Sequence, residues 1–377
     1  MIINNNSLLI NIVCMKINGT EYCSLWEENS KALSISAIDQ RLLPFRLEIA
    51  KIASYKEMVM AIKEMTIRGA PLIGIGGAYA IMLALQEIVQ NKQPFEKINE
   101  IISEIRSARP TAVNLMWAVD RVASKIDFSL SVEENYERSL QIARQIYSEE
   151  VRACKQIAKS GFDLIENLYS KYQRPLNILT HCNAGWLATV DWGTALAPIY
   201  YAHRKEIPLH VWVDETRPRN QGAKLTSFEL LGENIAHTII ADNTGGLLMQ
   251  TGKVDAVIVG ADRVTSKGDV CNKVGTYLKA LAAKEHNIPF WVAFPTSTID
   301  WEISDYREIP IEERPSEEID YIEGEYLDKI CKVRITPTGS KSLNYAFDIT
   351  PNQFVSKYIT ELGVFDSIQS LKDESFT

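Results

Sequence analysis

The chain has 377 residues, which at about 150 residues per domain predicts two domains with cores large enough to fold without disulfides. Hydrophobic residues make up 46% and charged residues 23%, an ordinary globular composition that excludes a disordered chain. The net charge of −8 argues against binding of a nucleic-acid backbone over a broad surface, because such a surface needs an excess of lysine and arginine.

The cysteines and the apolar runs indicate where the protein works. No stretch approaches the eighteen or so uncharged apolar residues of a membrane helix, so no membrane association is expected. The six cysteines are widely spaced, without a C-x-x-C pair, which favours free thiols in a reducing compartment over a zinc site or a disulfide framework. The apolar N-terminus lacks a basic leader and a clear cleavage site. We therefore expect a cytoplasmic protein without a metal site.

The first part of the chain is predicted to be mainly helical. Residues 1–43 are expected to form an N-terminal extension and leading segment, in which Met15 is a candidate start and residues 1–14 have no structural role. From residue 44 to residue 172 apolar residues recur at helical spacing. The predicted helices cover 54–65, 77–90, 95–108 and 139–170. This spacing predicts a helical domain over 44–172.

In the remainder, residues 173–377, short apolar strands alternate with helical stretches. The predicted strands are 175–180, 209–215, 236–242, 255–261 and 289–294, and the predicted helices start near Trp186 and Ser227 or cover 245–252 and 273–286. This alternation predicts β-α-β crossovers and a mostly parallel sheet covered on both faces. The fold class is therefore α/β, with a Rossmann-like catalytic domain after the helical one. The acidic stretch from Glu302 to Asp328 is expected to be a solvated loop.

Polar segments follow four of the predicted strands. In a doubly wound sheet the ligand site lies outside the carboxyl ends of the strands. Here those ends carry HCNAG, ETRPRNQGAKLT, DNTGG and DRVTSKGDVCNK, beginning at His181, Glu215, Asp242 and Asp262. We expect them to converge on one pocket for a small phosphorylated molecule.

Cys182 and Asp262 are the candidates for chemistry. Cys182 precedes a Gly-containing turn that is expected to open a helix, where backbone N–H groups and the helix dipole would lower the thiol pKa. An inert buried thiol is an equally supported interpretation, and the adjacent His181 fits a packing or hydrogen-bonding role. Asp262 ends an apolar strand, where desolvation would raise its pKa and suit a general acid. A helix cap or a salt bridge to Arg263 is the alternative.

Anion binding has several candidates: Arg68, Arg109, Lys224, Lys273, Gln221 and Asn272. Arg68 precedes a Gly-rich run that matches neither GxGxxG nor the Walker spacing, so no nucleotide fold is expected there. The run is either a phosphate-binding site at the start of the helix 77–90 or a set of glycines that permits close helix packing. Asn272 and Lys273 are expected at another helix start, where the dipole would favour a phosphate.

Six strings carry a family resemblance: RGAPLIG, RPTAVNL, LTHCNAGWLAT, VDETRPRNQGAKLT, VGADRVTSKGDVCNKVGTY and AFPTSTID. With these strings in this order, the chain from about Asp39 to Pro351 resembles the methylthioribose-1-phosphate isomerase family, whose fold is shared with regulatory subunits of translation initiation factor 2B. The resemblance implies a homodimeric aldose–ketose isomerase of methionine salvage. It would convert S-methyl-5-thioribose 1-phosphate to S-methyl-5-thioribulose 1-phosphate without a cofactor.

The resemblance also assigns residues. The catalytic cysteine falls on Cys182 and the acid on Asp262. The substrate-binding positions implied are Arg68, Gly69, Ala70, Arg109, Gln221, Asn272 and Lys273. The chain departs from the usual pattern beside Gln221, where Asn220 and Lys224 stand in place of Leu and Arg.

Two other interpretations stay open. A 5-deoxyribose-1-phosphate or ribose-1,5-bisphosphate isomerase would use the same thiol and acid, although a second phosphate would need a further basic cluster, and none is evident. A non-catalytic regulatory subunit of a translation-initiation exchange factor would share the fold but typically lack the paired Cys and Asp. The expected partner is thus a small phosphorylated sugar, not a nucleic acid or a membrane.

Overall fold

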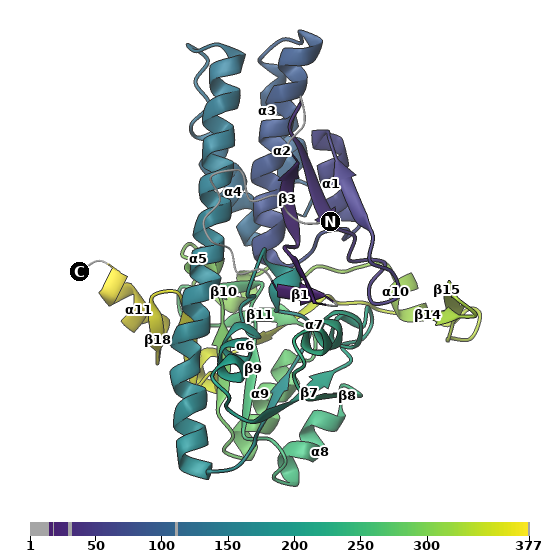
Figure 1. Ribbon diagram of the computed structural model, residues 1–377, viewed down its shortest axis with the longest axis vertical. Helices are drawn as coiled ribbons and strands as arrows, with labels where there is room; N and C mark the ends of the chain where they lie inside the picture. Colours follow the sequence, from purple (N-terminus) through teal and green to yellow (C-terminus); the bar gives the residue numbers. More distant parts are fainter. Residues whose placement is uncertain (1–14, 18, 29–31, 110–111, 376–377) are drawn as a thin grey trace.

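The structure is a computed structural model that describes residues 15–17, 19–28, 32–109 and 112–375. The predicted extension over residues 1–14 lies outside the described residues. Figure 1 shows two stacked parts: a bundle of helices above and a sheet with flanking helices below, with α5 running through both. The chain is therefore an α/β protein with a large, mostly parallel sheet, as the strand–helix alternation predicts.

Short strands that the sequence did not predict precede the helices. β1 (Met15–Ile17) pairs with β2 (Thr20–Tyr22), and an antiparallel sheet is formed by β3 (Leu25–Glu28), β4 (Ser34–Ile38) and β5 (Ile49–Ile52). Apolar side chains of this sheet belong to the same core as the helices that follow.

The helical part contains α1 (Tyr55–Lys63), α2 (Ala70–Asn91), α3 (Lys97–Arg106), α4 (Val113–Ala123) and α5 (Val132–Tyr172). Capping boxes begin two of them: Ser54 with Glu57 starts α1, and Ser131 with Glu134 starts α5. α4 was not predicted, and the 41-residue α5 packs against α2 at one end and α6 at the other.

α2 corrects two expectations. It begins at Ala70, so Gly74 and Gly77 lie inside it, where added Cβ atoms would collide with Asn114 and Leu115 of α4; close packing is their role. α2 is also long and apolar enough to cross a membrane, so the expectation that no stretch of the chain approaches this length was wrong. However, 89% of its most apolar window is buried inside the protein, as in a central core helix.

The main sheet has seven strands: β6 (Leu176–Thr180), β7 (Leu209–Asp214), β8 (His237–Ile240), β9 (Ala256–Val259), β12 (Phe290–Ala293), β17 (Lys357–Thr360) and β18 (Gly363–Phe365). Their order is β18-β17-β12-β9-β6-β7-β8, and every neighbouring pair except β17–β18 is parallel. The chain runs outward from β6 to β8 and then returns to β9 on the other side of β6. A ligand crevice is expected at this reversal.

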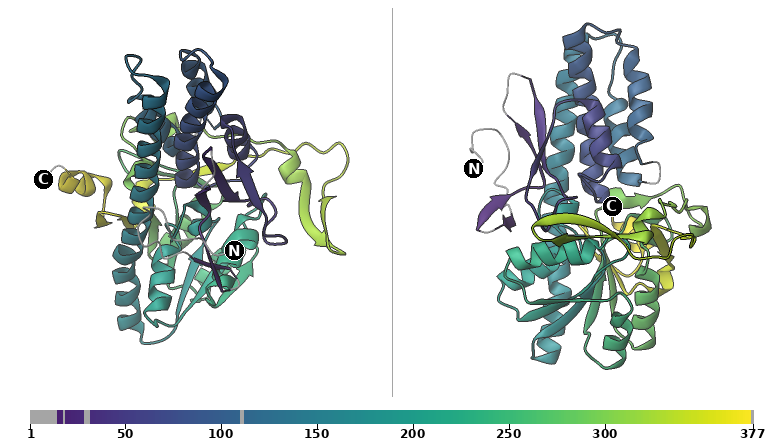
Figure 2. Two further views of the ribbon diagram at one scale, coloured as in Figure 1. Left: turned by 45° about the horizontal axis from the view of Figure 1, so that its top comes forward. Right: turned by 90° about the vertical axis from the view of Figure 1, so that its right-hand side faces the viewer.

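Helices cover both faces of the sheet (Figure 2). They include α6 (Ala197–Arg204), α7 (Ser227–Gly232), α8 (Thr244–Gln250) and α9 (Thr276–Glu285), whereas α11 (Ile368–Ser375) lies beside the edge strand β18. Neighbouring residues of β6 point to opposite faces: Ile178 joins the core that contains α6, and Leu179 joins the core that contains α9. The helix expected from Trp186 is only a 3-10 turn, Trp186–Ala188, and α6 begins at Ala197.

A second, four-stranded sheet lies beside the main one. It consists of β13 (Ile299–Asp300), β10 (Arg263–Thr265), β11 (Val270–Lys273) and β16 (Phe347–Thr350). Asn272 and Lys273 therefore end a strand, and the helix expected to start there begins at Thr276.

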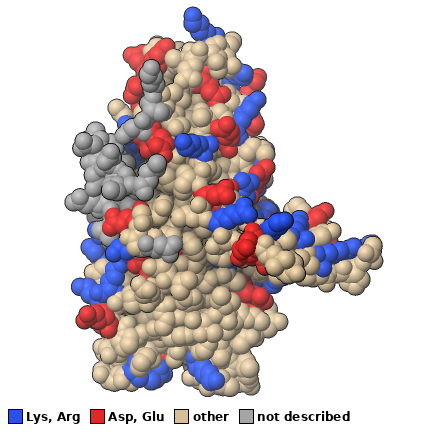
Figure 3. All heavy atoms as spheres, turned by 45° about the vertical axis from the view of Figure 1, so that its right-hand side comes forward, with Lys and Arg blue, Asp and Glu red and all other residues tan. Residues whose placement is uncertain are grey.

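The acidic stretch is structured rather than a simple solvated loop. It forms α10 (Glu317–Asp320) and β14 (Tyr321–Tyr326), which pairs with β15 (Lys329–Arg334) in a hairpin. The hairpin projects from the body of the molecule in Figure 3. Glu312 and Glu318, at its base, form ion pairs with arginines of the body.

Candidate active site

One cavity brings together the nine residues that the family resemblance assigns to the site. It lies between the N-terminus of α2 and the carboxyl ends of β6 and β9, where the strand order reverses, and its volume is about 60 Å³. Its lining includes Arg68, Gly69, Ala70, Arg109, Cys182, Gln221, Asp262, Asn272 and Lys273. We call this space the inner cavity.

Cys182 is the second residue after β6, and its backbone is left-handed, with φ of 65°. Two threonines hold it: its N–H donates to Thr216 Oγ1 at 2.8 Å, and its carbonyl accepts from Thr226 Oγ1 at 2.7 Å. Strained backbone of this kind persists only where the surroundings enforce it. The loop therefore presents the thiol to the inner cavity.

The predicted lowering of the Cys182 pKa by a helix dipole is wrong. Burial raises the pKa of the thiol, and the nearby cations Arg68 and Lys273 oppose this shift. No regular helix begins here, and the N–H groups of Trp186 and Leu187 donate to the carboxylate of Glu229. These donors are therefore not available to the sulfur.

Asp262 follows β9 on the opposite side of the reversal from Cys182. Burial raises the pKa of its carboxyl group, as predicted, while Lys273, Arg109 and Arg68 lower it. The alternative of a salt bridge to Arg263 does not hold, because Arg263 pairs with Asp300 at 3.3 Å. Burial thus favours a neutral carboxyl group facing the inner cavity.

Three cations surround the inner cavity. Arg68 donates to the side-chain and backbone oxygens of Asn183 at 2.5 and 2.8 Å, and Arg109 donates to Glu312 at 3.0 Å. Burial lowers the pKa of Lys273, whose ammonium lies 4.8 Å from the ring centre of Phe347. A dianionic group would find charge-assisted donors on several sides here.

The N-terminus of α2 adds backbone donors. Gly69 is its N-cap, with φ of 96° and no side-chain cap, so N–H groups of the first turn remain for a ligand. A side chain at this position would also overlap the backbone of Ala188. Helix dipole and cations therefore act on the same space.

The amide residues differ in how they are held. Asn272 donates to Thr276 Oγ1 at 3.1 Å, whereas the buried Gln221 Oε1 has no hydrogen-bond partner among the described residues. Lys224, a further anion candidate, does not line the inner cavity; it pairs with Glu323 of the hairpin at 3.1 Å.

Sequence reasoning missed Asn183 and Glu229. The buried Glu229 carboxylate accepts from Asn183 Nδ2 at 2.9 Å, Trp186 N at 3.0 Å, Leu187 N at 3.1 Å and Tyr200 Oη at 2.5 Å. Because Asn183 Nδ2 faces Glu229, its Oδ1 must face Arg68. Burial raises the pKa of Glu229 to about 7. In the sequence Glu229 stands between Phe228 and Leu230 in a short helix and carries no signal of this role.

His181 lines the inner cavity, and both of its ring nitrogens contact neighbouring residues. Its Nδ1 lies 2.8 Å from Asp214 Oδ2 and its Nε2 lies 2.9 Å from the carbonyl of Val274. With Asp242, these two residues form a group that could ligate a metal ion. The Lys279 ammonium lies 3.0 Å from Asp214 and donates to the Asp242 carbonyl, so a cation already sits at this group.

Comparison with known proteins identifies the family. Residues 66–367 match the model of the initiation factor 2 subunit family. Relatives named methylthioribose-1-phosphate isomerase include one from Sulfurimonas denitrificans, 52% identical over 89% of this chain and 94% of its own length, and one from Gluconobacter oxydans, 47% identical over 94% and 96%.

Solved structures give the same result. A 5-methylthioribose 1-phosphate isomerase from Pyrococcus horikoshii has a TM-score of 0.79 and 35% identity, covering 93% of this chain and 95% of its own. A protein described as translation initiation factor eIF-2B subunit delta, from A. fulgidus, has a TM-score of 0.70 and 38% identity, with 92% and 96% covered. The chain belongs to the methylthioribose-1-phosphate isomerase family, within the initiation factor 2 subunit family.

Proposed function

We propose that this protein is the aldose–ketose isomerase of methionine salvage that converts S-methyl-5-thio-α-D-ribose 1-phosphate to S-methyl-5-thio-D-ribulose 1-phosphate. Relatives named methylthioribose-1-phosphate isomerase include eight that are 45–52% identical to the chain. The observation that carries the proposal is the inner cavity itself, where a thiol and a buried carboxyl group share one space with three cations.

The reaction needs such a site because C1 of the substrate is an acetal that bears phosphate, so the ring cannot open spontaneously to an aldehyde. Arg68, Arg109, Asn272 and Lys273 hold the phosphate, together with the N-terminus of α2 at Gly69 and Ala70. Gln221, whose Oε1 is unpartnered, accepts from a sugar hydroxyl. This clamp keeps C1 and C2 beside the reacting groups.

Asp262 and Cys182 perform the proton transfers. The neutral Asp262 carboxyl gives its proton to the ring oxygen as the bond from C1 to that oxygen breaks. The Cys182 thiolate, favoured by Arg68 and Lys273, takes the proton from C2 and an enol phosphate forms. The thiol then protonates C1, while the C2 hydroxyl becomes the ketone and returns its proton to Asp262. A direct hydride shift from C2 to C1 is the alternative.

Incubation with the substrate in deuterated water, followed by NMR, tests the proposal. Formation of the ketose supports the isomerase, and deuterium at C1 supports transfer through Cys182, whereas ketose without deuterium leaves the hydride shift. No ketose from methylthioribose 1-phosphate, 5-deoxyribose 1-phosphate or ribose 1,5-bisphosphate would refute the isomerase and favour a regulatory subunit.

Further aspects of the protein are part of the same proposal. We propose that it works without a cofactor, as a homodimer in the cytoplasm. We also propose domains at 44–172 and 173–377, after a leading segment 1–43, with the second domain of the Rossmann-like class. In support, α5 ends at Tyr172 and the main sheet then begins at Leu176.

A further inference from the structure

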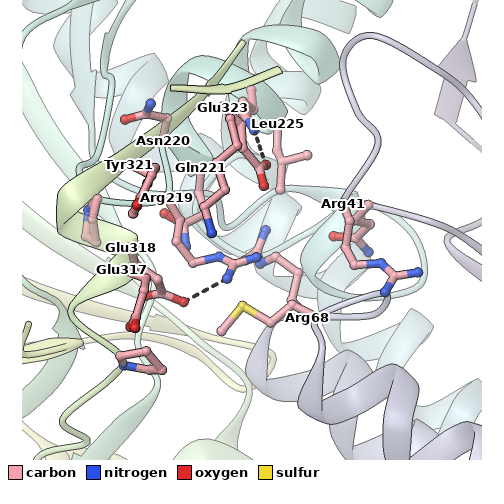
Figure 4. A pocket seen from close by; sticks show the side chains of 16 residues that line it. Arg41, Arg68, Arg219, Asn220, Gln221, Leu225, Glu317, Glu318, Tyr321 and Glu323 are labelled. Atoms are coloured by element: carbon pink, nitrogen blue, oxygen red, sulfur yellow. Dashed lines mark hydrogen bonds and ion pairs between the residues drawn. The ribbon is translucent and has the colours of Figure 1, made fainter. Parts of the chain in front are cut away.

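His181 is the residue directly before Cys182, and its side chain is completely buried. The ring lines the inner cavity. A second cavity, of about 290 Å³ and shown in Figure 4, shares Arg68 and Gln221 with the inner one, but its described lining does not include His181. Any role of His181 in the site is therefore exerted at the inner cavity, beside the thiol.

Both ring nitrogens of His181 face oxygen atoms. Nδ1 lies 2.8 Å from Asp214 Oδ2, and Nε2 lies 2.9 Å from the carbonyl oxygen of Val274. A carbonyl oxygen can only accept, so Nε2 must carry a hydrogen. In a neutral imidazole Nδ1 would then carry none, and Asp214 would have to be protonated to bind it. The contacts therefore leave two states: an imidazolium beside a carboxylate, or a neutral ring beside a neutral carboxyl group.

The surroundings of Asp214 favour the first state. Lys279 Nζ lies 3.0 Å from the same Oδ2 atom, and an ammonium at this distance favours the ionised carboxylate. A proton on Oδ2 would lie beside that ammonium. A proton on Oδ1 would point at no acceptor, because this buried oxygen has no hydrogen-bond partner among the described residues, and it would leave Nδ1 facing a lone pair. With Asp214 ionised, His181 carries a hydrogen on both nitrogens.

A second acidic residue, Asp348, lies near the ring. Its carboxylate accepts from the N–H groups of Gly275 at 2.6 Å and Tyr277 at 3.2 Å. Burial raises the pKa of Asp348, and these N–H groups oppose the shift together with the charges of His181 and Lys279. Gly275 lets the ring approach closely, since a Cβ there would lie 3.0 Å from Cε1 and 3.1 Å from Nε2 of His181. The two cations of this wall are thus balanced by two acidic groups.

The two hydrogen bonds of the ring connect three strand ends. His181 follows β6, Asp214 ends β7, and Val274 follows β11. In the chain Cys182 is the neighbour of His181, and Lys273 is the neighbour of Val274. The distance from the thiol to a cation of the inner cavity therefore depends on one buried ring.

We propose that His181 is a positioning residue of the active site, held as an imidazolium between the Asp214 carboxylate and the Val274 carbonyl. Through this clamp it fixes the Cys182 thiol relative to the Lys273 ammonium. Its ring donates nothing to the substrate, because both of its N–H groups are already used. The inference rests on the proposed isomerase function and adds the residue that orients the reacting thiol.

NMR of the imidazole nitrogens tests the state of the ring without any substrate. The measurement is made at about pH 7.5, where a histidine in water is mostly neutral. The chain has five histidines, so replacing the other four one at a time assigns their signals and leaves His181 intact. We expect hydrogens on both nitrogens of His181. His210, whose pKa is lowered by burial, is the internal reference and should show one nitrogen without a hydrogen. One bare nitrogen on His181 would overturn the inference.

The kinetic arm uses His181→Asn and His181→Gln, which keep a neutral donor but cannot bind acceptors on two sides of a ring. We expect each to lower kcat by about tenfold or more, because misplacing a reacting group by about 1 Å can cost a factor of 10². Inhibition by inorganic phosphate should stay close to the wild-type value, since Arg68, Arg109 and the N-terminus of α2 remain. The control His210→Asn changes a histidine at the other end of β7, bound to Thr238 at 2.9 Å, and should leave both values unchanged.

Wild-type kcat in both folded His181 variants would overturn the positioning role. A parallel loss of kcat and of phosphate inhibition would also overturn it, because a general disturbance of the cavity would then explain both. If neither variant folds, the nitrogen spectrum of the wild type decides alone. Absence of ketose formation by the wild type would instead refute the proposed function, and the spectrum would still show whether the clamp exists.

Discussion

Glu229 controls the position of Arg68 through Asn183, although it does not line the inner cavity. The perturbation that tests this role is Glu229→Gln, which keeps the size of the side chain but replaces one acceptor oxygen by a donor. The two carboxylate oxygens accept four hydrogen bonds: Oε1 from Asn183 and Leu187, Oε2 from Trp186 and Tyr200. A glutamine can serve only one of these pairs.

The loss of stability in Glu229→Gln depends on which hydrogen-bond donors lose their acceptor. With the new amide nitrogen at the Oε2 position, the Tyr200 hydroxyl can rotate and accept, but the Trp186 N–H stays buried and unpaired. An unsatisfied buried donor costs about 1–3 kcal/mol, so we expect the free energy of unfolding to fall by about 2 kcal/mol. With the nitrogen at the Oε1 position, Asn183 loses its partner and its amide is free to turn away from Arg68.

Loss of this orientation should appear in substrate binding. We expect Glu229→Gln to raise KM by about tenfold or more and to weaken inhibition by inorganic phosphate in parallel, because misplacing a binding group by about 1 Å can cost a factor of 10². Tyr200→Phe is the matched control, since it removes a donor from the same carboxylate but leaves the Asn183 bond. It should lower the melting temperature without changing KM. If Glu229→Gln lowers stability and leaves KM and phosphate inhibition at wild-type values, this reasoning is refuted.

Three more predictions concern the cavity wall at Gly69, the titration of Asp262 and the buried Glu150 of α5. Gly69→Ala should lower the melting temperature and raise KM, because its backbone is left-handed and its Cβ would overlap Ala188; wild-type values for both would contradict the assigned geometry. The reaction needs the Cys182 thiolate and the neutral Asp262 carboxyl together, so kcat should rise with pH through the lower of their two pKa values and fall above the higher one. Burial raises both pKa values, and the thiol starts from the higher usual value, so Asp262 sets the acid limb. Arg109→Gln, which removes a cation that lowers the pKa of Asp262, should move the acid limb to higher pH, and an unmoved limb would count against Asp262 as the acid. Burial raises the pKa of Glu150 from 4.5 to about 7. The favourable contribution of its neutral carboxyl group to the free energy of unfolding is therefore complete below pH 4.5 and should be lost as pH rises through 7. Thermal melts should then show Glu150→Gln stabilising the protein by up to about 3 kcal/mol near pH 8 and not near pH 4, whereas an effect independent of pH would contradict the shift.

Cys182 and Asp262 could be placed from the sequence because the carboxyl ends of parallel strands meet at one edge of a sheet. The apolar strands are short and bounded by polar segments, so both residues could be assigned to strand ends without knowing the strand order. Arg68, a proposed phosphate-binding residue, was singled out beside a Gly-rich run, but the helix was expected to begin at residue 77 rather than at Ala70, and Gly69 was assigned only through the family resemblance.

The electrostatic state of the thiol could not be predicted in this way. It depends on where the N–H groups after Gly185 find acceptors, and they find one in Glu229, more than forty residues further along the chain. Glu312 was expected in a solvated loop because its neighbours are acidic, yet tertiary structure brings it to Arg109. Long-range polar pairs of this kind leave no periodic signal in a sequence.

The kcat values of Cys182→Ser and Asp262→Asn test the central claim most directly. Both replacements are close in size to the native side chains and remove only the acid–base group. The account predicts that each lowers kcat by about 10²–10⁴-fold while the circular dichroism spectrum and phosphate binding stay those of the wild type. Turnover near the wild-type rate in either folded variant would contradict the assignment of that residue to the reaction.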